Sequence, residues 1–104
     1  MKHLRFDDEL RAAITHNLGQ AVAAPVPAGG LKRAAVCVIL TDDGEGGAAL
    51  VLTLRAKHLS AHSGQFALPG GRVDSGETAV EAALREPREE INLELARETI
   101  LGRL

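Results

Sequence analysis

The most constraining feature of the sequence is the stretch GGRVDSGETAVEAALREPREEINL at 70–93, in which a glycine turn precedes a strongly acidic helix. Thr78 and Glu81 have the T-x-x-E spacing of a capping box, in which each side chain binds an otherwise unpaired backbone N–H. Asn92 follows the last apolar position, and Asn readily adopts the left-handed conformation that ends helices. The stretch therefore predicts a helix over 79–91.

The predicted helix has two chemically different faces, because successive side chains are turned by about 100°. One face is an apolar stripe composed of Val80, Leu84, Pro87 and Ile91. The other is an arc of carboxylates composed of Glu86, Glu89 and Glu90. These carboxylates repel one another, and a hard divalent cation such as Mg²⁺ would relieve the repulsion. A solvated acidic face, supported by pairing of Arg85 with Glu81 and Glu89, is the alternative that the residues leave open.

The spacing of these residues resembles the Nudix box, the sequence signature of the Nudix hydrolases. From 71 the chain reads G-x5-E-x7-R-E-x-x-E-E-x-x-L, and the residues in register are Gly71, Glu77, Arg85, Glu86, Glu89, Glu90 and Leu93. Six prescribed polar or glycine matches arise at a given position by chance with a probability of roughly 10⁻⁷. The chain departs from the box at Pro87, where a bulky aliphatic residue is expected, and at Asn92, where glycine is expected.

The resemblance implies a loop–helix–loop that binds Mg²⁺ or Mn²⁺ and hydrolyses a nucleoside diphosphate linked to another moiety. The implied metal ligands are Glu86, Glu90, Glu89 and the carbonyl of Gly71. The implied catalytic residues are Arg85, which would orient the carboxylates, and Glu89 and Glu90, with Glu89 sharing the metal or the base role. Glu77 would support the loop–helix junction. The chemistry suits these residues, because a metal ion lowers the pKa of a bound water and a carboxylate can accept its proton.

Pro87 conflicts with its place in a helix. Proline lacks the N–H that would bind the Ala83 carbonyl, and its ring clashes with that turn, at a cost of ~3 kcal/mol or more in a helix interior. The sequence therefore predicts a kink between Ala83 and Pro87, which would shift Glu86 relative to Glu89 and Glu90 and weaken metal binding.

The stretch LTLRAKHLSAHSGQFALPGG at 52–71 resembles a motif of the coenzyme A diphosphatase branch of the Nudix hydrolases, L-L-T-x-R-S/A-x3-R-x3-G-x3-F-P-G-G. The residues in register are Leu52, Thr53, Arg55, Ala56, Gly64, Pro69, Gly70 and Gly71. Ser60 replaces the second Arg and Leu68 replaces the Phe. The candidate substrate-binding residues are Arg55, Lys57, Gly64 and Gly70. The expected products from coenzyme A are 4′-phosphopantetheine and 3′,5′-ADP. The alternative substrates are a dinucleotide, a nucleotide sugar or an oxidised nucleotide. The alternative function is that of a catalytically impaired Nudix-fold binding module.

The resemblance implies an α/β (α+β) fold, a Nudix-like mixed β-sheet packed against helices. Residues 1–22 hold an amphipathic helix over 4–18, residues 23–32 form a linker, and residues 33–104 form the Nudix domain. The short apolar runs at 33–40 and 48–55 predict a hairpin of strands covered on both faces, and 56–77 reads as a loop with a short strand around Phe66. The end of the chain reads as the approach to a further strand, so we expect part of the usual domain to be missing.

Composition limits the partners of the chain. A formal charge of −2 gives no reason to expect nucleic acid, and no apolar run is long enough to cross a membrane. A cytoplasmic protein with a small-molecule substrate is the expectation, and unpaired strand edges make pairing into a homo-oligomer an expectation as well. Cys37 reads as a buried structural thiol rather than a nucleophile. His58 and His62 read as polar loop residues, with a shared metal as the alternative.

Overall fold

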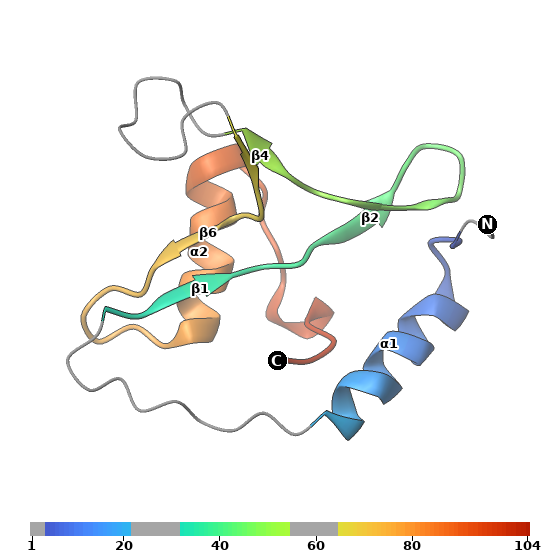
Figure 1. Ribbon diagram of the computed structural model, residues 1–104, viewed down its shortest axis with the longest axis horizontal. Helices are drawn as coiled ribbons and strands as arrows, with labels where there is room; N and C mark the ends of the chain where they lie inside the picture. The colour runs from blue at the N-terminus through green and yellow to red at the C-terminus, as the bar shows by residue number, and fades with distance from the viewer. Residues whose placement is uncertain (1–3, 22–31, 55–64) are drawn as a thin grey trace.

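The computed structural model describes residues 4–21, 32–54 and 65–104. These residues form an α+β fold, as the sequence predicts, in which short antiparallel strands lie against one of the helices (Figure 1). In chain order the elements are α1 (Asp8–Gln20), β1 (Ala34–Val36), β2 (Leu40–Asp42), β3 (Ala48–Leu50), β4 (Thr53–Leu54), β5 (Phe66–Ala67), β6 (Gly70–Arg72), α2 (Ala79–Ile91) and the 3-10 turn η1 (Arg97–Thr99).

The strands pair differently from the simple hairpin that the sequence predicts. β2 and β3 do form a hairpin, with Leu40 opposite Leu50, but β1 pairs with β6 and β4 pairs with β5. The predicted glycine turn before the helix lies at Ser75 and Gly76, where Gly76 has a φ of 80°. Gly70 and Gly71, by contrast, lie in strand β6. Gly70 fits there because it has no side chain: a Cβ at this position would collide with the Ala35 carbonyl and with Val36. Close backbone approach therefore overrides the low strand propensity of glycine.

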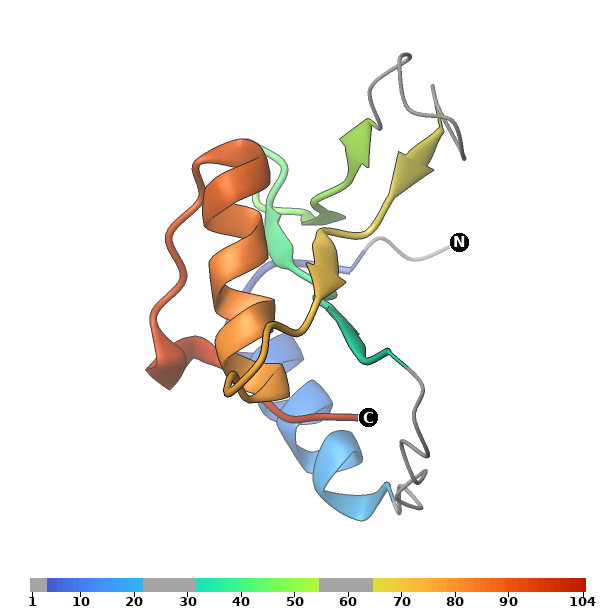
Figure 2. The same cartoon turned by 90° about the vertical axis from the view of Figure 1, so that its left-hand side faces the viewer.

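Side chains along the strands alternate between two very different environments. Ile39 and Thr53 are buried, and α2 packs against β1 and β6 (Figure 2). Six apolar side chains along the strands and their connections are exposed, namely Val36, Val38, Leu50, Leu52, Leu54 and Phe66. Because side chains two apart in an extended chain share a side, and Leu54 lies opposite Phe66, we group these residues as one surface, here called the outer face. The prediction that these strands are covered on both faces is therefore wrong for the described residues, because α2 covers one face only.

Helix α2 begins and ends where the sequence predicts. Both bonds of the capping box between Thr78 and Glu81 are present, and Asn92 adopts the left-handed conformation at φ 55°. The predicted apolar stripe is only partly correct, since Pro87 is fully buried but Ile91 is 37% exposed. Ala82, on the other side of the helix, is completely buried. The helix packs through its small side chains because these let it approach the strands closely.

Helix α1 begins later than predicted. Its N-cap is Asp7, whose side chain accepts a hydrogen bond from the Leu10 N–H, and none of its residues is buried. The preceding residues are extended and pair with the β2–β3 turn through bonds of Phe6 to Gly46 and of Ala48 to Leu4. The predicted linker lies outside the described residues except for residue 32. Neither described helix has the length and apolar character that a membrane crossing requires.

Candidate active site

Arg85 lies at the centre of a cluster of charged groups that joins α2 to the loop before it. Its guanidinium uses each of its N–H donors: two bind Glu77, one binds Glu86, one binds Glu89 and one binds the Arg72 carbonyl, at 2.8–3.0 Å. The Asp74 carboxylate lies 3.5 Å from the same group. Arg85 thus contacts two of the three carboxylates that the resemblance implies it orients.

The pair formed by Arg85 and Glu77 is bidentate and mostly shielded from solvent. Side-chain exposure is 17% for Arg85 and 14% for Glu77. Hydrogen bonds from Arg85, helped by the Asp74 N–H, lower the pKa of Glu77 from 4.5 to about 2. The same pairing raises the pKa of Arg85, so that both groups remain charged at neutral pH. Since the loop and the helix each supply one partner, this pair fixes the loop–helix junction.

The three carboxylates of the helix differ in environment. Glu86 is 17% exposed and Glu89 is 55% exposed, and both accept hydrogen bonds from the same Arg85 nitrogen. Glu90 turns toward the strands, where its Oε1 accepts the Gly70 N–H at 2.9 Å. Glu89 is thus more open to solvent than Glu86.

The glycines of β6 make room for these carboxylates. A Cβ on Gly71 would lie 2.5–2.7 Å from the carboxylate atoms of Glu86, closer than real contacts allow. Gly70 supplies the backbone donor for Glu90. Glu86 and Glu90 therefore lie against a strand that has no side chains at the point of contact, so the two carboxylates can approach its backbone closely.

The donor set fits Mg²⁺ or Mn²⁺, which prefer oxygen ligands from carboxylates and backbone carbonyls. One guanidinium faces the carboxylates of Asp74, Glu77, Glu86 and Glu89, which leaves an excess of negative charge. Within residues 4–21, 32–54 and 65–104 no three acidic, histidine or cysteine side chains lie together at metal-ligand spacing. The reason is visible in the contacts: Glu86 and Glu89 turn toward Arg85, whereas Glu90 turns toward Gly70.

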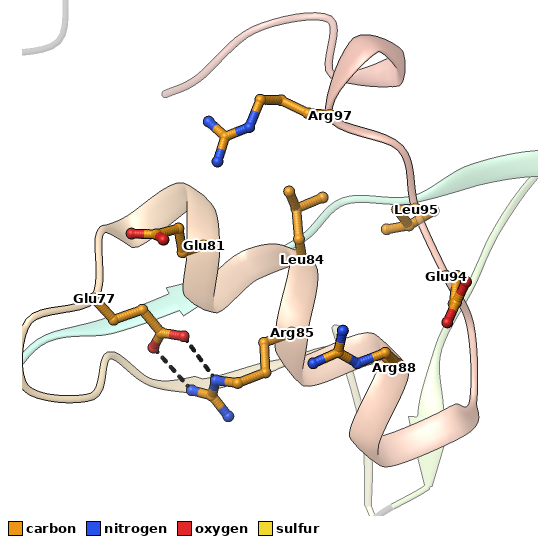
Figure 3. Close-up of a pocket in the computed structure, with 8 residues that line it drawn as sticks. All are labelled: Glu77, Glu81, Leu84, Arg85, Arg88, Glu94, Leu95 and Arg97. Atoms are coloured by element: carbon orange, nitrogen blue, oxygen red, sulfur yellow. Dashed lines mark hydrogen bonds and ion pairs between the residues drawn. The ribbon is translucent and has the colours of Figure 1, made fainter.

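A cavity of about 430 Å³ lies on another side of α2, between the helix and the segment that follows it (Figure 3). Its lining residues are Glu77, Glu81, Leu84, Arg85, Arg88, Glu94, Leu95 and Arg97. The cavity touches the Glu77–Arg85 pair, but Glu86, Glu89 and Glu90 do not line it. We therefore place the candidate site at the carboxylates and the glycine strand, where oxygen ligands gather, and not in this cavity.

Several predicted site residues cannot be placed. Arg55, Lys57 and Gly64 lie outside the described residues, as do His58 and His62. Gly70, predicted to bind substrate, donates its N–H to Glu90. The residue that sequence reasoning missed is Asp74, which approaches Arg85; its position in the loop between the glycines and Glu77 was the available signal.

Comparison with known proteins identifies the family of the chain. The NUDIX domain family model matches residues 31–104, which is more than half of the chain. The chain is 45% identical over 66 residues to Nudix hydrolase 3 of Caenorhabditis elegans (64% of this chain, 27% of that protein) and 38% identical over 99 residues to Nudix hydrolase 22, chloroplastic, of Arabidopsis thaliana (88% and 30%). It is 43% identical over 68 residues to Nudix hydrolase 15, mitochondrial, of Arabidopsis thaliana (61% and 22%). The chain thus spans less than a third of the length of these relatives, and it belongs to the NUDIX domain family.

Proposed function

We propose that this domain hydrolyses the diphosphate linkage of a nucleoside diphosphate joined to another moiety, with Mg²⁺ or Mn²⁺ as cofactor. The observation that carries the proposal is the arrangement of Glu86, Glu89 and Glu90 around the Arg85 guanidinium and the glycine strand. A surface of solvated acids would not need a guanidinium with every donor used, nor glycines that leave room for carboxylates.

The environments of the three glutamates suggest a division of roles. The Glu86 side chain is more shielded from solvent than that of Glu89, so Glu86 suits a metal ligand, together with Glu90 and the Gly71 carbonyl. Glu89 is exposed and suits a base that takes a proton from the attacking water. When bound, the metal ion would offset the charge on the diphosphate oxygens and lower the pKa of a water. Arg85 would hold Glu86 and Glu89 in orientation throughout.

Coenzyme A or one of its derivatives is the substrate that we propose. The support is the motif at 52–71, in which Arg55 and Lys57 would bind phosphate groups and Gly64 and Gly70 would allow close approach of the backbone. Water would add to one phosphorus of the diphosphate while the bridging P–O bond breaks, giving 4′-phosphopantetheine and 3′,5′-ADP. A dinucleotide, a nucleotide sugar or an oxidised nucleotide remains the alternative.

The test is product analysis of a substrate panel with Mg²⁺ and with Mn²⁺. The panel contains coenzyme A, an acyl-CoA, a dinucleotide, a nucleotide sugar and an oxidised nucleoside triphosphate. Release of 4′-phosphopantetheine and 3′,5′-ADP supports the proposal, and Glu89→Gln should abolish it. Binding of coenzyme A without turnover under any metal would instead favour a Nudix-fold binding module. Inorganic phosphate as the main first product from coenzyme A would overturn the reaction class.

We also propose that the outer face pairs with the outer face of a second copy. Its six apolar residues are 49–71% exposed, and together they offer roughly 600 Å² of apolar surface at on the order of 100 Å² each. Two copies would bury about 1,200 Å², the lower end for a stable interface. Sedimentation analysis should show a dimer that Leu52→Glu converts to a monomer; a monomer at all concentrations would overturn this pairing. Cytoplasmic localisation stays a prediction, since two of the relatives bear chloroplast and mitochondrial names.

A further inference from the structure

Pro87 leaves one backbone carbonyl of α2 without its usual hydrogen-bond donor. A helical residue at 87 would normally donate its N–H to the Ala83 carbonyl, four residues earlier, and proline has no N–H to donate. Yet α2 runs without interruption from Ala79 to Ile91, and Pro87 is fully buried against the rest of the domain. The Ala83 carbonyl is part-buried, and a carbonyl withdrawn from water without a donor destabilises a fold, so a replacement donor would stabilise this turn.

The missing donor comes from the strand side of the domain. The Cys37 Sγ lies 2.9 Å from the Ala83 oxygen, and since a carbonyl can only accept, the thiol donates. The position of Cys37 is fixed from its other side as well, because its backbone N–H binds the carbonyl of Pro69, which is fully buried. Burial raises the pKa of the Cys37 thiol, so the thiol keeps the proton that it donates.

The turn held in this way carries a residue of the candidate site. Glu86 lies between Ala83 and Pro87, and its carboxylate is positioned against Gly71 and Arg85. Glu89 and Glu90 follow in the next turn. If the 83–87 turn relaxed, Glu86 would move relative to the other two carboxylates, because the bond that normally sets their spacing is the one that Pro87 lacks.

We infer that Cys37 is a positioning residue, whose thiol replaces the backbone donor removed by Pro87 and thereby holds Glu86 in register with Glu89 and Glu90. This role rests on the proposed metal site for its functional part. Its structural part, the exchange of one donor for another, does not depend on that site.

A double-mutant cycle tests the inference, with Cys37→Ala, Pro87→Ala and the double variant compared with the parent chain. Cys37→Ala alone should lower Tm by about 4–8 °C and weaken Mn²⁺ binding about 3- to 10-fold. In the Pro87→Ala background the backbone N–H at 87 serves Ala83, so the same substitution should change Mn²⁺ affinity less than twofold. Cys37→Ser, which keeps a donor, should stay within twofold of the parent chain.

Equal losses from Cys37→Ala in both backgrounds would overturn the inference, since only the lost volume of the side chain would then matter. If Cys37→Ala fails to fold, recovery of folding in the double variant supports the inference and failure to recover overturns it. If the parent chain binds no Mn²⁺ in calorimetry, the proposed metal site fails, and the cycle in Tm still decides whether the thiol holds the turn.

Discussion

The two described helices have the same length but differ in how much they pack against the rest of the domain. Each has 13 residues and an N-cap side chain that accepts a backbone hydrogen bond. Helix α2 packs on β1 and β6, buries Ala82 and Pro87, and carries the charged cluster around Arg85. Helix α1 buries no residue, and its Leu18 side chain lies beside Gly102 in the C-terminal segment.

This difference shows that helix formation and helix function depend on different contacts. Both helices have a side-chain cap, but tertiary packing is what couples a helix to the stability of the domain. Changes on and around α2 should therefore affect the whole molecule and the proposed metal site, whereas matched changes on α1 should act locally.

The largest effect should come from Arg85. Arg85→Ala removes the group that orients Glu86 and Glu89 and should weaken Mn²⁺ binding about 100-fold; Arg85→Lys keeps the charge but not the fork of donors and should weaken it about 10-fold. Titration calorimetry gives both affinities. Arg88→Lys, at an exposed position one turn away without an ion pair in the described structure, is the matched control. Unchanged affinity in Arg85→Ala would place the metal elsewhere.

A smaller effect is expected where a strand glycine meets a helix carboxylate. Gly71→Ala puts a methyl group against Glu86, whose flexible side chain must move, so Mn²⁺ affinity should fall about 10-fold with little change in Tm. Gly19→Ala is the control on α1, since nothing lies within 4 Å of its Cβ and alanine favours a helix. Calorimetry and circular dichroism measure the two quantities. Equal metal affinity in both variants would show that Glu86 is not a ligand.

The caps test the comparison directly. Thr78→Ala removes the side-chain acceptor that begins α2 and should lower stability by about 1 kcal/mol, measured by denaturant unfolding. Asp7→Ala removes the equivalent bond of α1 and should leave the main transition unchanged, because unfolding of α1 exposes no buried side chain. A similar loss in both variants would mean that the two helices unfold as one unit.

The smallest expected effect concerns pH. The pKa of Glu77 is lower in the folded domain than the ordinary 4.5, so its pair with Arg85 stabilises the fold above that pH and is lost as pH falls toward about 2. Solvent near the site reduces the size of this contribution. Glu77→Gln should flatten the dependence of Tm on pH between 4.5 and 2. A parent and a variant with parallel pH curves would contradict the lowered pKa.

Local signals predict local features of this molecule well. The capping box at Thr78 and the left-handed Asn92 define α2 because each acts within one turn of the helix. The pairing of β1 with β6 was not predictable in this way, since it depends on a glycine strand that joins segments far apart in the chain. Likewise the spacing of the glutamates predicts a shared site, but not that Glu90 turns to the Gly70 N–H while Glu86 and Glu89 turn to Arg85.

The exposed position of Phe66 on the outer face is suited to a fluorescent probe. The chain has no Trp and no Tyr, so it lacks a useful intrinsic fluorophore. Phe66 is 71% exposed and pairs across the strands with Leu54, so an indole in its place would sense water directly. In Phe66→Trp, emission would start at the red wavelengths of a solvated indole and move toward the blue when another surface covers the strands. Titrating the dark parent chain into this variant would report the contact at one position, with no background signal to subtract.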